Sequence, residues 1–439
     1  MQQRYAMGGT NSSEPNSSSS LALEETQPND QYMEQNANQS SESGGEALPA
    51  VGAFCLADFE IIDFLGRGGY SMVCTGVLRR TRQKFAIKMI EKSQIVTEKQ
   101  ASRCFLEREL LESIDCPFIV KLYGTFKDEK QLYYVLEYVD GSELSAYIRK
   151  CTRFTEDTAR IIFGSLVLTL AYLHSKNIVY RDLKPKNVMV TTRRTLKLID
   201  FGLSRRLEPS ERSQSFAGTP HYLAPEVVSR NGHDFAVDWW TLGVLLFEIL
   251  AGRPPFYSEN RERLYAKISQ VRFEFPSVIQ PNAVDLIRKL LDRNPAERIK
   301  FVYGSTEDDA GVKTTGVKTP LANDSSSQND MSRTSSAGVS SPTYIVKVLK
   351  DPSNLRDTST SSPTYIDIAV PNGILKHPWM ASFDWSALGR FELKPRFDTV
   401  FTPEFYPMSD EEEDEDEEGE SEGMPPSSTG AADPFKDDW

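Results

Sequence analysis

Two short runs near the middle of the chain carry side chains suited to phosphate chemistry. Residues 180–187 read YRDLKPKN and residues 200–202 read DFG. Phosphoryl transfer needs a carboxylate to orient the attacking hydroxyl, a cation near the transferred group and two oxygen ligands for magnesium. The residues that could supply these four parts are Asp182, Lys184, Asn187 and Asp200. The spacing therefore predicts a phosphoryl-transfer site, and the alternative is a polar loop between strands.

A glycine cluster earlier in the chain would suit the phosphates of a nucleotide. Residues 65–73 read LGRGGYSMV and lie between two runs typical of strands. Glycines let backbone N–H groups approach phosphate oxygens without obstruction by side chains. Many hairpins also carry two or three glycines, so a plain turn is the alternative. Because a strand follows rather than a helix, the cluster is neither a Rossmann fingerprint nor a Walker loop.

Lys88 closes the run AIK at 86–88 and lies inside an apolar strand. A buried amine needs an anionic partner, and a phosphate together with a helix carboxylate would serve. Glu107 lies on a predicted helix at a suitable separation along the chain. The alternative is a lysine on the exposed face of a strand.

The elements around these residues change character along the chain. Runs 59–62, 85–87 and 132–138 are rich in aromatic and β-branched residues and predict strands. Apolar residues recur at helical spacing over 98–114, and the chain is mostly helical after residue 141, including 238–250 and 283–291. A strand-rich part followed by a helix-rich part predicts an α+β fold with two lobes.

Two stretches have the composition of disordered chain. Residues 1–53 are rich in Ser, Gln and Asn and cannot bury enough apolar surface to offset the entropy of ordering. Residues 304–373 are rich in Ser and Thr, and the sequence SSPTYI occurs there twice, at 340–345 and 361–366. We therefore expect a disordered N-terminal segment and a disordered, low-complexity insertion.

Charge and cysteine usage exclude several classes of protein. The net charge is −13, but residues 410–439 hold 14 acids and one base, so the other 409 residues carry 49 of each. A neutral body argues against a nucleic-acid partner, which would need a basic face. The five cysteines form no CxxC pair, which argues against a zinc site and against a disulfide framework. With no signal peptide and no apolar run near 20 residues, we expect no membrane span and a cytoplasmic location, with the nucleus left open.

These motifs resemble the eukaryotic protein kinases, specifically the AGC group that includes cyclic-AMP-dependent protein kinase. The likeness covers about 59–299 and 374–380 and includes PFIVKL at 117–122, GTPHYLAPE at 218–226 and DWWTLG at 238–243. Tyr180 stands where the AGC group has the first residue of its catalytic loop. The resemblance implies a bilobal protein kinase fold, serine/threonine kinase activity, protein substrates, and ATP and Mg²⁺ as cofactors.

The resemblance also implies a role for each matching residue. Asp182 would be the catalytic base or the group that orients the hydroxyl, and Lys184 would neutralise the γ-phosphate. Asn187 and Asp200 would ligate Mg²⁺, and Lys88 would hold the α- and β-phosphates while paired with a helix glutamate. The matching nucleotide-binding positions are Leu65, Gly66, Gly68, Ser71, Val73, Ala86, Lys88, Glu107, Glu137, Val139 and Met189.

Substrate recognition and regulation depend on further positions. Glu143 and Glu248 match carboxylates that bind substrate arginines, which predicts a basic residue three before the target. Lys186 stands where basophilic relatives have a third carboxylate, so one negative subsite becomes positive. Ser215 matches an activating phosphosite and implies an upstream kinase. Gln214 replaces a tryptophan that grips the regulatory subunit, so we leave that partner open.

The resulting domain prediction has three parts. Residues 1–53 form the N-terminal segment, 54–380 the kinase domain, and 381–439 an AGC-type tail with an acidic run at 410–418. Within the domain we expect an N-lobe over 54–139 and a C-lobe over 140–380, interrupted by the insertion 304–373. The competing functions are a pseudokinase scaffold, which would lack one of the four catalytic residues, and a kinase of small molecules.

Overall fold

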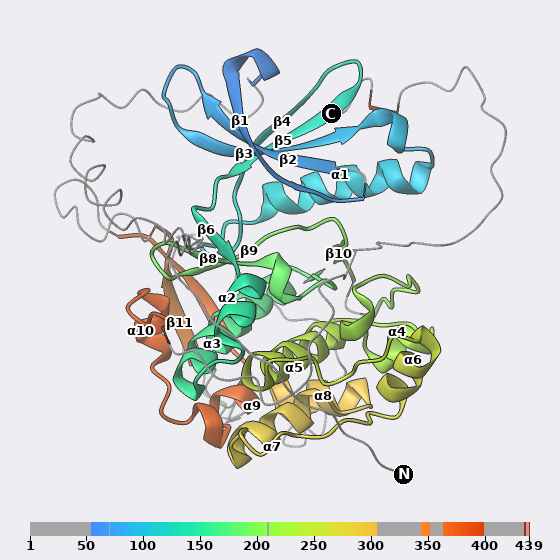
Figure 1. The fold of residues 1–439 in the computed structure, drawn as a ribbon, viewed down its shortest axis with the longest axis vertical. Coiled ribbons are helices and arrows are strands. Elements are labelled where there is room, and N and C mark those ends of the chain that lie inside the picture. The colour runs from blue at the N-terminus through green and yellow to red at the C-terminus, as the bar shows by residue number, and fades with distance from the viewer. Residues whose placement is uncertain are drawn as a thin grey trace, which may run out of the picture. The chain divides into compact units, whose positions relative to one another are not determined.

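The computed structural model describes residues 54–69, 71–208, 210–304, 344–351, 363–398, 434–435 and 439. All of them belong to the unit Pro49–Trp439. They form a strand-rich lobe and a helical lobe joined by an extended segment (Figure 1). The α+β, bilobal fold predicted from the sequence is confirmed. Residues 1–53 and the acidic run 410–418 lie outside the described residues, so the predictions for them stay predictions.

The N-lobe is a five-stranded antiparallel sheet with the order β1-β2-β3-β5-β4. Its strands contain the three runs expected to be extended. Along the third strand, Phe85 and Ile87 are fully buried on one face, so the alternation turns Lys88 to the other. The strands are β1 (Phe59–Arg67), β2 (Ser71–Leu78), β3 (Lys84–Glu91), β4 (Leu122–Lys127) and β5 (Gln131–Glu137).

Helix α1 (Glu98–Ser113) is the long helix of this lobe and matches the predicted range 98–114 to one residue. It begins with a capping box, in which the Thr97 hydroxyl accepts from the Gln100 amide and the Gln100 side chain accepts from the Thr97 amide. Buried residues recur at intervals of three along the inward face of this helix. They are Ala101, Cys104, Glu107, Leu110 and Leu111. One carboxylate is therefore buried on an otherwise apolar stripe.

The C-lobe is built around α5, which is buried on nearly all sides and includes the fully buried Trp239 and Trp240. The helix ends at Gly252, whose φ is +81° and where a Cβ would lie 2.3 Å from the Thr152 carbonyl oxygen. The helices of this lobe are α2 (Leu144–Cys151), α3 (Glu156–Ser175), α4 (Pro225–Val228), α5 (Ala236–Ala251), α6 (Arg261–Ser269), α7 (Pro281–Leu290), α8 (Pro295–Tyr303), α9 (Asn372–Leu375) and α10 (Trp385–Gly389).

Helix α3 is the one helix among the described residues that is long and apolar enough to cross a membrane. The expectation that no apolar run approaches this length was therefore wrong. In the structure 72% of its most apolar window is buried within the protein, as in the core helix of a soluble domain.

Two small sheets lie between the lobes and position the loops that matter for chemistry. Strands β6 (Gly141–Glu143), β8 (Val188–Thr191) and β9 (Leu196–Leu198) form one sheet in that order. Strands β7 (Ile178–Val179) and β10 (Arg205–Arg206) form the other. Because β7 and β8 flank the run 180–187, both ends of that loop are held by strand pairing.

Part of the segment 304–373 is not the disordered loop that we expected, and for these residues the prediction was wrong. Strands β11 (Tyr344–Leu349) and β12 (Tyr365–Val370) pair as an antiparallel hairpin, each beginning at the tyrosine of one SSPTYI copy. Alternate residues such as Val346 and Ile368 are buried. A Cβ on Gly389 of α10 would lie 2.5 Å from the Lys347 carbonyl oxygen, so the hairpin packs closely on the lobe. Residues 305–343 and 352–362 lie outside the described residues.

Candidate active site

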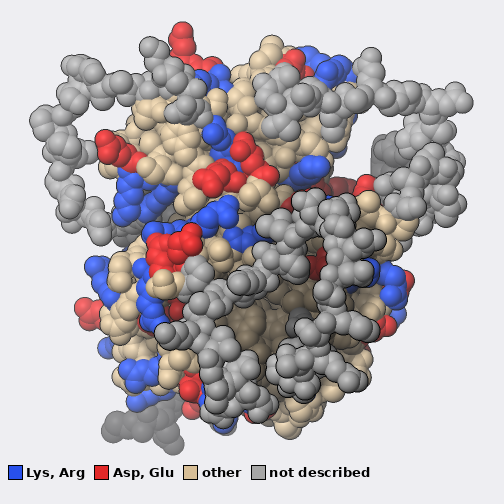
Figure 2. Space-filling model, turned by 180° about the vertical axis from the view of Figure 1, so that it is seen from behind, with Lys and Arg blue, Asp and Glu red and all other residues tan. Residues whose placement is uncertain are grey.

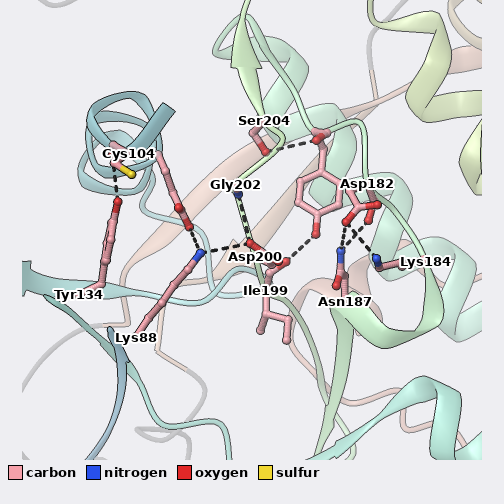
Figure 3. A network of polar contacts seen from close by, with 12 residues as sticks. Lys88, Cys104, Tyr134, Asp182, Lys184, Asn187, Ile199, Asp200, Gly202 and Ser204 are labelled. Carbon is pink, nitrogen blue, oxygen red and sulfur yellow. Dashed lines mark hydrogen bonds and ion pairs between the residues drawn. The ribbon is translucent and has the colours of Figure 1, made fainter. Parts of the chain in front are cut away.

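Lys88 of β3 contacts Glu107 of α1 and, as Figure 3 shows, also points toward Asp200 of the DFG run. The Lys88 Nζ lies 2.7 Å from Glu107 Oε1 and 3.4 Å from Asp200 Oδ1. Burial would lower the pKa of Lys88, but the two carboxylates outweigh it and the pKa is raised. The same lysine lowers the pKa of Asp200. The contact therefore holds a charged amine beside two anions, between a strand, a helix and the DFG run.

The loop 180–187 is held in place by one buried carboxylate, that of Asp238 in α5. Asp238 is fully buried and accepts from the backbone amides of Tyr180 at 2.9 Å and Arg181 at 2.8 Å. Its Oδ2 also lies 2.8 Å from His174 Nε2. Arg181 has a φ of +70°, in the left-handed region that is costly for a residue with a Cβ. The strained turn persists because Asp238 and the neighbouring strands hold it.

Asp182 is the carboxylate of this loop, and several side chains restrict its orientation. It is 8% exposed, and its oxygens accept from Asn187 Nδ2 at 2.7 Å and Thr219 Oγ1 at 3.0 Å. Lys184 Nζ lies 3.4 Å away. Burial, opposed by Lys184, raises the pKa of Asp182 to about 6. The site thus orients a carboxylate that can accept a hydrogen bond from a hydroxyl.

Asn187 and Asp200 offer a fitting oxygen pair for a divalent cation. The amide nitrogen of Asn187 donates to Asp182, which leaves its amide oxygen as the acceptor of that side chain. Asp200 has a φ of +59°, and its Oδ1 accepts from the Gly202 amide at 3.1 Å. Carboxylate and amide oxygens are ligands that hard cations prefer. The described residues contain no group of three or more His, Cys, Asp or Glu suited to a metal, so this pair is their candidate.

The predicted nucleotide-binding residues lie on elements of both lobes, near Lys88 and Asp182. Val73 on β2 pairs with Lys88 on β3, and Ala86 pairs with Leu136 of β5. Met189 of β8 pairs with Glu143 of β6 on the C-lobe side. Leu65 and Gly66 belong to β1, Ser71 begins β2, and Gly68 donates from its amide to the Ser71 carbonyl at 2.8 Å. Glu137 ends β5, and Val139 follows in the segment between the lobes.

The three residues expected to face the substrate lie on separate elements of the C-lobe. Glu143 ends β6, and its carboxylate accepts from the Ser145 hydroxyl at 2.7 Å. Glu248 lies on α5 and accepts from the Tyr222 hydroxyl. Lys186 lies in the 3₁₀ turn Pro185–Asn187, between Asp182 and Asn187 along the chain.

Arg181 joins the catalytic loop to the segment 203–216. Its Nε donates to the Leu203 carbonyl at 2.7 Å, and its Nη1 donates to the hydroxyls of Ser213, at 3.2 Å, and Ser215. The two hydroxyls lie 2.9 Å apart. The predicted phosphosite therefore lies against an arginine one residue from Asp182.

Two residues of this neighbourhood were not singled out by the sequence reasoning. Thr219 donates to Asp182, and the fully buried Ser213 links Arg181 with Ser215. Thr219 could have been found from the run GTP at 218–220, which lies C-terminal to the DFG run and begins the matching run 218–226. Ser213 gives no local signal, because its role depends on a partner 32 residues earlier in the chain.

The chain end returns to the N-lobe beside α1 (Figure 1). Trp439 packs edge-to-face against Phe105 and Tyr134, with ring centroids 5.7 and 5.2 Å apart, and its Nε1 donates to the Phe126 carbonyl. Phe435 is buried and stacks on Phe105 at 5.0 Å.

Comparison with known proteins identifies the family. The protein kinase domain matches residues 59–304. Two similar proteins are the "RAC family serine/threonine-protein kinase homolog" of Dictyostelium discoideum and the "cAMP-dependent protein kinase catalytic subunit" of Schizosaccharomyces pombe. They are 39% identical over 246 residues and 41% identical over 253 residues. These matches cover 56% and 58% of this chain, and 55% and 48% of the two relatives.

A further relative is the cGMP-dependent protein kinase, isozyme 2 forms cD5/T2, of Drosophila melanogaster, 42% identical over 57% of this chain and 27% of the relative. The chain thus spans about half the length, or less, of these curated relatives. All three are kinases of the AGC group, as the motifs suggested. The match over more than half of the chain, on a bilobal fold in which Lys88 contacts both Glu107 and Asp200, shows that the chain belongs to the protein kinase family.

Proposed function

We propose that this chain is an active protein serine/threonine kinase that uses ATP and Mg²⁺. The observation that carries the proposal is the buried Asp182, held by Asn187 and Thr219 with Lys184 at 3.4 Å. A carboxylate so restrained is pre-organised to receive a hydroxyl proton. The neighbouring Lys88 pair, which also reaches Asp200, supports phosphate binding at the same place.

The proposed transfer uses these residues as follows. The hydroxyl of a substrate serine or threonine donates to Asp182, and its oxygen bonds to the γ-phosphorus as the bond to the bridging oxygen breaks and ADP leaves. The hydroxyl proton passes to the carboxylate. Lys184 offsets negative charge on the transferred group, and Lys88 holds the α- and β-phosphates. Asp200 and Asn187 would hold Mg²⁺, which would supply positive charge beside the phosphate oxygens.

The rival functions make different predictions. A pseudokinase scaffold would bind partners without turnover, yet Lys88, Asp182, Asn187 and Asp200 are all present. A small-molecule kinase would not need the run APE at 224–226. Purified chain with labelled ATP, a peptide array and a panel of small alcohols and sugars separates the three. Transfer of label to peptides supports our proposal. Transfer of label to small molecules alone contradicts it, and so does nucleotide binding without any transfer of label.

We also propose a basophilic substrate preference with an altered second subsite. Glu143 of β6 and Glu248 of α5 offer two carboxylates in the C-lobe, which favours an arginine or lysine three residues before the target. Lys186 brings a positive charge into the same loop as Asp182, where it would repel a second basic residue two before the target. On the described part of the face drawn in Figure 2, basic and acidic side chains are interspersed, whereas a nucleic-acid-binding face is mainly basic.

Ser215 is proposed as an activating phosphosite used by an upstream kinase. Its hydroxyl contacts Arg181, which adjoins Asp182, so a phosphate there would pair with the guanidinium and order the loop. Mass spectrometry of active protein, together with the activity of Ser215→Ala, tests this. Phosphate at Ser215 and a large loss of activity in the variant support the proposal, and full activity of the variant contradicts it.

A further inference from the structure

His233 is a buried histidine opposite the proposed phosphosite. It is 3% exposed and lies just before α5, far along the chain from the catalytic loop. Its backbone exchanges two hydrogen bonds with Ser213, at 2.8 and 2.9 Å, as an isolated antiparallel bridge. Side chains of residues directly opposite each other in such a pair project from the same face. The imidazole therefore lies on the side of the bridge that carries the Ser213 hydroxyl.

The Ser213 hydroxyl is the centre of a small polar cluster. It lies 3.2 Å from Arg181 Nη1 and 2.9 Å from the Ser215 hydroxyl. Arg181 and His233 also line one small cavity together with Thr219 and Thr241. Ser213 thus contacts both Arg181 and Ser215, and the imidazole lies on the same side of the bridge as the Ser213 hydroxyl. A hydroxyl, a guanidinium and an imidazole can each donate to a phosphate oxygen.

Other charged groups around His233 are already engaged. Arg205 is paired with Glu211 at 2.7 Å. Asp234 lies 3.8 Å from Arg212, and Asp238 accepts from the catalytic-loop amides and His174. Burial, and then repulsion by Arg181, lowers the pKa of His233 to about 4, so the imidazole is neutral near pH 7.

We propose that His233 is a ligand of the phosphate carried by Ser215, and that phosphorylation makes its imidazole easier to protonate. This inference rests on the proposed phosphosite. A phosphate of about −1.5 to −2 charge would neutralise Arg181 and attract a proton to the ring. Because the phosphorylated form then binds a proton more readily, its stability relative to the unphosphorylated form rises as the pH falls.

The test uses the full chain carrying Asp182→Asn, with serine or genetically encoded phosphoserine at 215. This background removes dependence on the chain's own catalysis, so failure of the inference is distinct from failure of the kinase assignment. The chain has four histidines, so NMR titration of their rings is tractable, and His233→Gln assigns the signal. His377, which lies 2.9 Å from Asp285 in another part of the C-lobe, is the internal control.

We expect the pKa of His233 to rise by at least one unit with phosphoserine, while that of His377 stays unchanged. An unchanged or lowered pKa of His233 would overturn the proposal. As a second readout, the melting-temperature gain due to phosphoserine is compared at pH 5.5 and pH 7.5. At the lower pH, phosphoserine should raise the melting temperature of the parent by more than it raises that of His233→Gln. The His377→Gln variant should show the same gain as the parent. Equal gains in the parent and His233→Gln at both values would also contradict it.

Discussion

At Asp182, three neighbouring side chains, those of Asn187, Thr219 and Lys184, converge on one buried carboxylate. Each contact restricts the carboxylate to one orientation, which lowers the cost of organising it during the reaction. At the residue scale, the chemistry therefore depends on a few contacts of defined direction.

The first prediction concerns Asp182 and Asp200. Asp182→Ala and Asp200→Ala should each reduce kcat by about 10²–10⁴-fold or more, since the hydroxyl loses its acceptor or the cation its carboxylate. Steady-state kinetics with a peptide substrate checks this. The matched control is Asp157→Ala, whose side chain is 92% exposed on α3. Near parental turnover in either active-site variant would contradict the kinase assignment.

The second prediction concerns Lys186. Lys186→Glu should strengthen the preference for a basic residue two before the target, because a charge-assisted contact is worth about 1.5–3 kcal/mol. That corresponds to roughly a ten- to hundredfold change in kcat/KM. A peptide library scored at that subsite measures it, with Lys376→Glu, an exposed lysine at the end of α9, as the charge control. Identical profiles for the parent and Lys186→Glu would show that Lys186 does not touch substrate.

At the scale of elements, buried ionic contacts tie together segments far apart in the chain. Arg298 of α8 is fully buried, pairs with Glu226 at the start of α4, and lies over the Trp240 ring of α5 at 5.2 Å. The side-chain pair joins the end of the segment that contains Ser215 to the base of the C-lobe. Such a pair holds elements in register more than it adds net stability.

The third prediction tests this pair. Arg298→Met should lower the free energy of unfolding by about 3–5 kcal/mol, since Glu226 would remain buried without its partner. The double variant Glu226→Gln/Arg298→Met should recover part of the loss. Denaturant unfolding of both measures the difference, and Arg390→Met, which breaks an exposed pair with Glu392, should change stability little. Equal stability of the parent and Arg298→Met would refute the argument.

At the scale of the whole molecule, the chain end supports the helix that carries Glu107. Trp439 packs on Phe105 of α1 and on Tyr134, whose hydroxyl donates to the Cys104 carbonyl of the same helix at 2.9 Å. Lys88 lies 5.8 Å from the Tyr134 ring. The C-terminus, α1 and the Lys88–Glu107 contact therefore form one continuous packed region.

The fourth prediction follows from that continuity. Trp439→Ala should lower the free energy of unfolding by less than the contribution of a fully buried large apolar side chain, about 1.5–3 kcal/mol, because Trp439 is only partly buried. It should also lower kcat/KM, because α1 would hold Glu107 beside Lys88 less often. Trp439→Phe, which keeps a ring but loses the hydrogen bond to Phe126, should show a smaller effect on both. Unchanged melting and kinetics in the alanine variant would mean that the chain end does not support α1.

Much of the architecture could be predicted because its signals are local. The strands around Phe59 and Phe85, the helix that begins after Thr97 and the order of the motifs at 180–187 and 200–202 follow from residue types within a few positions. The prediction of disorder for the insertion was wrong at the hairpin, because the short alternation of buried Val346 and Val348 lies between Ser- and Thr-rich segments that dominate the composition.

The sequence alone determined which residue types stand in which order, and hence the family and the candidate chemistry, because phosphoryl transfer demands fixed side chains at short spacing. The tertiary structure decided what depends on distant partners: the hairpin that seats on Gly389, the chain end on α1, and the cluster of Ser213 and His233 beside Arg181. A contact between residues tens to hundreds of positions apart leaves no periodic pattern in either segment. Its free energy exists only once the fold has brought the two surfaces together.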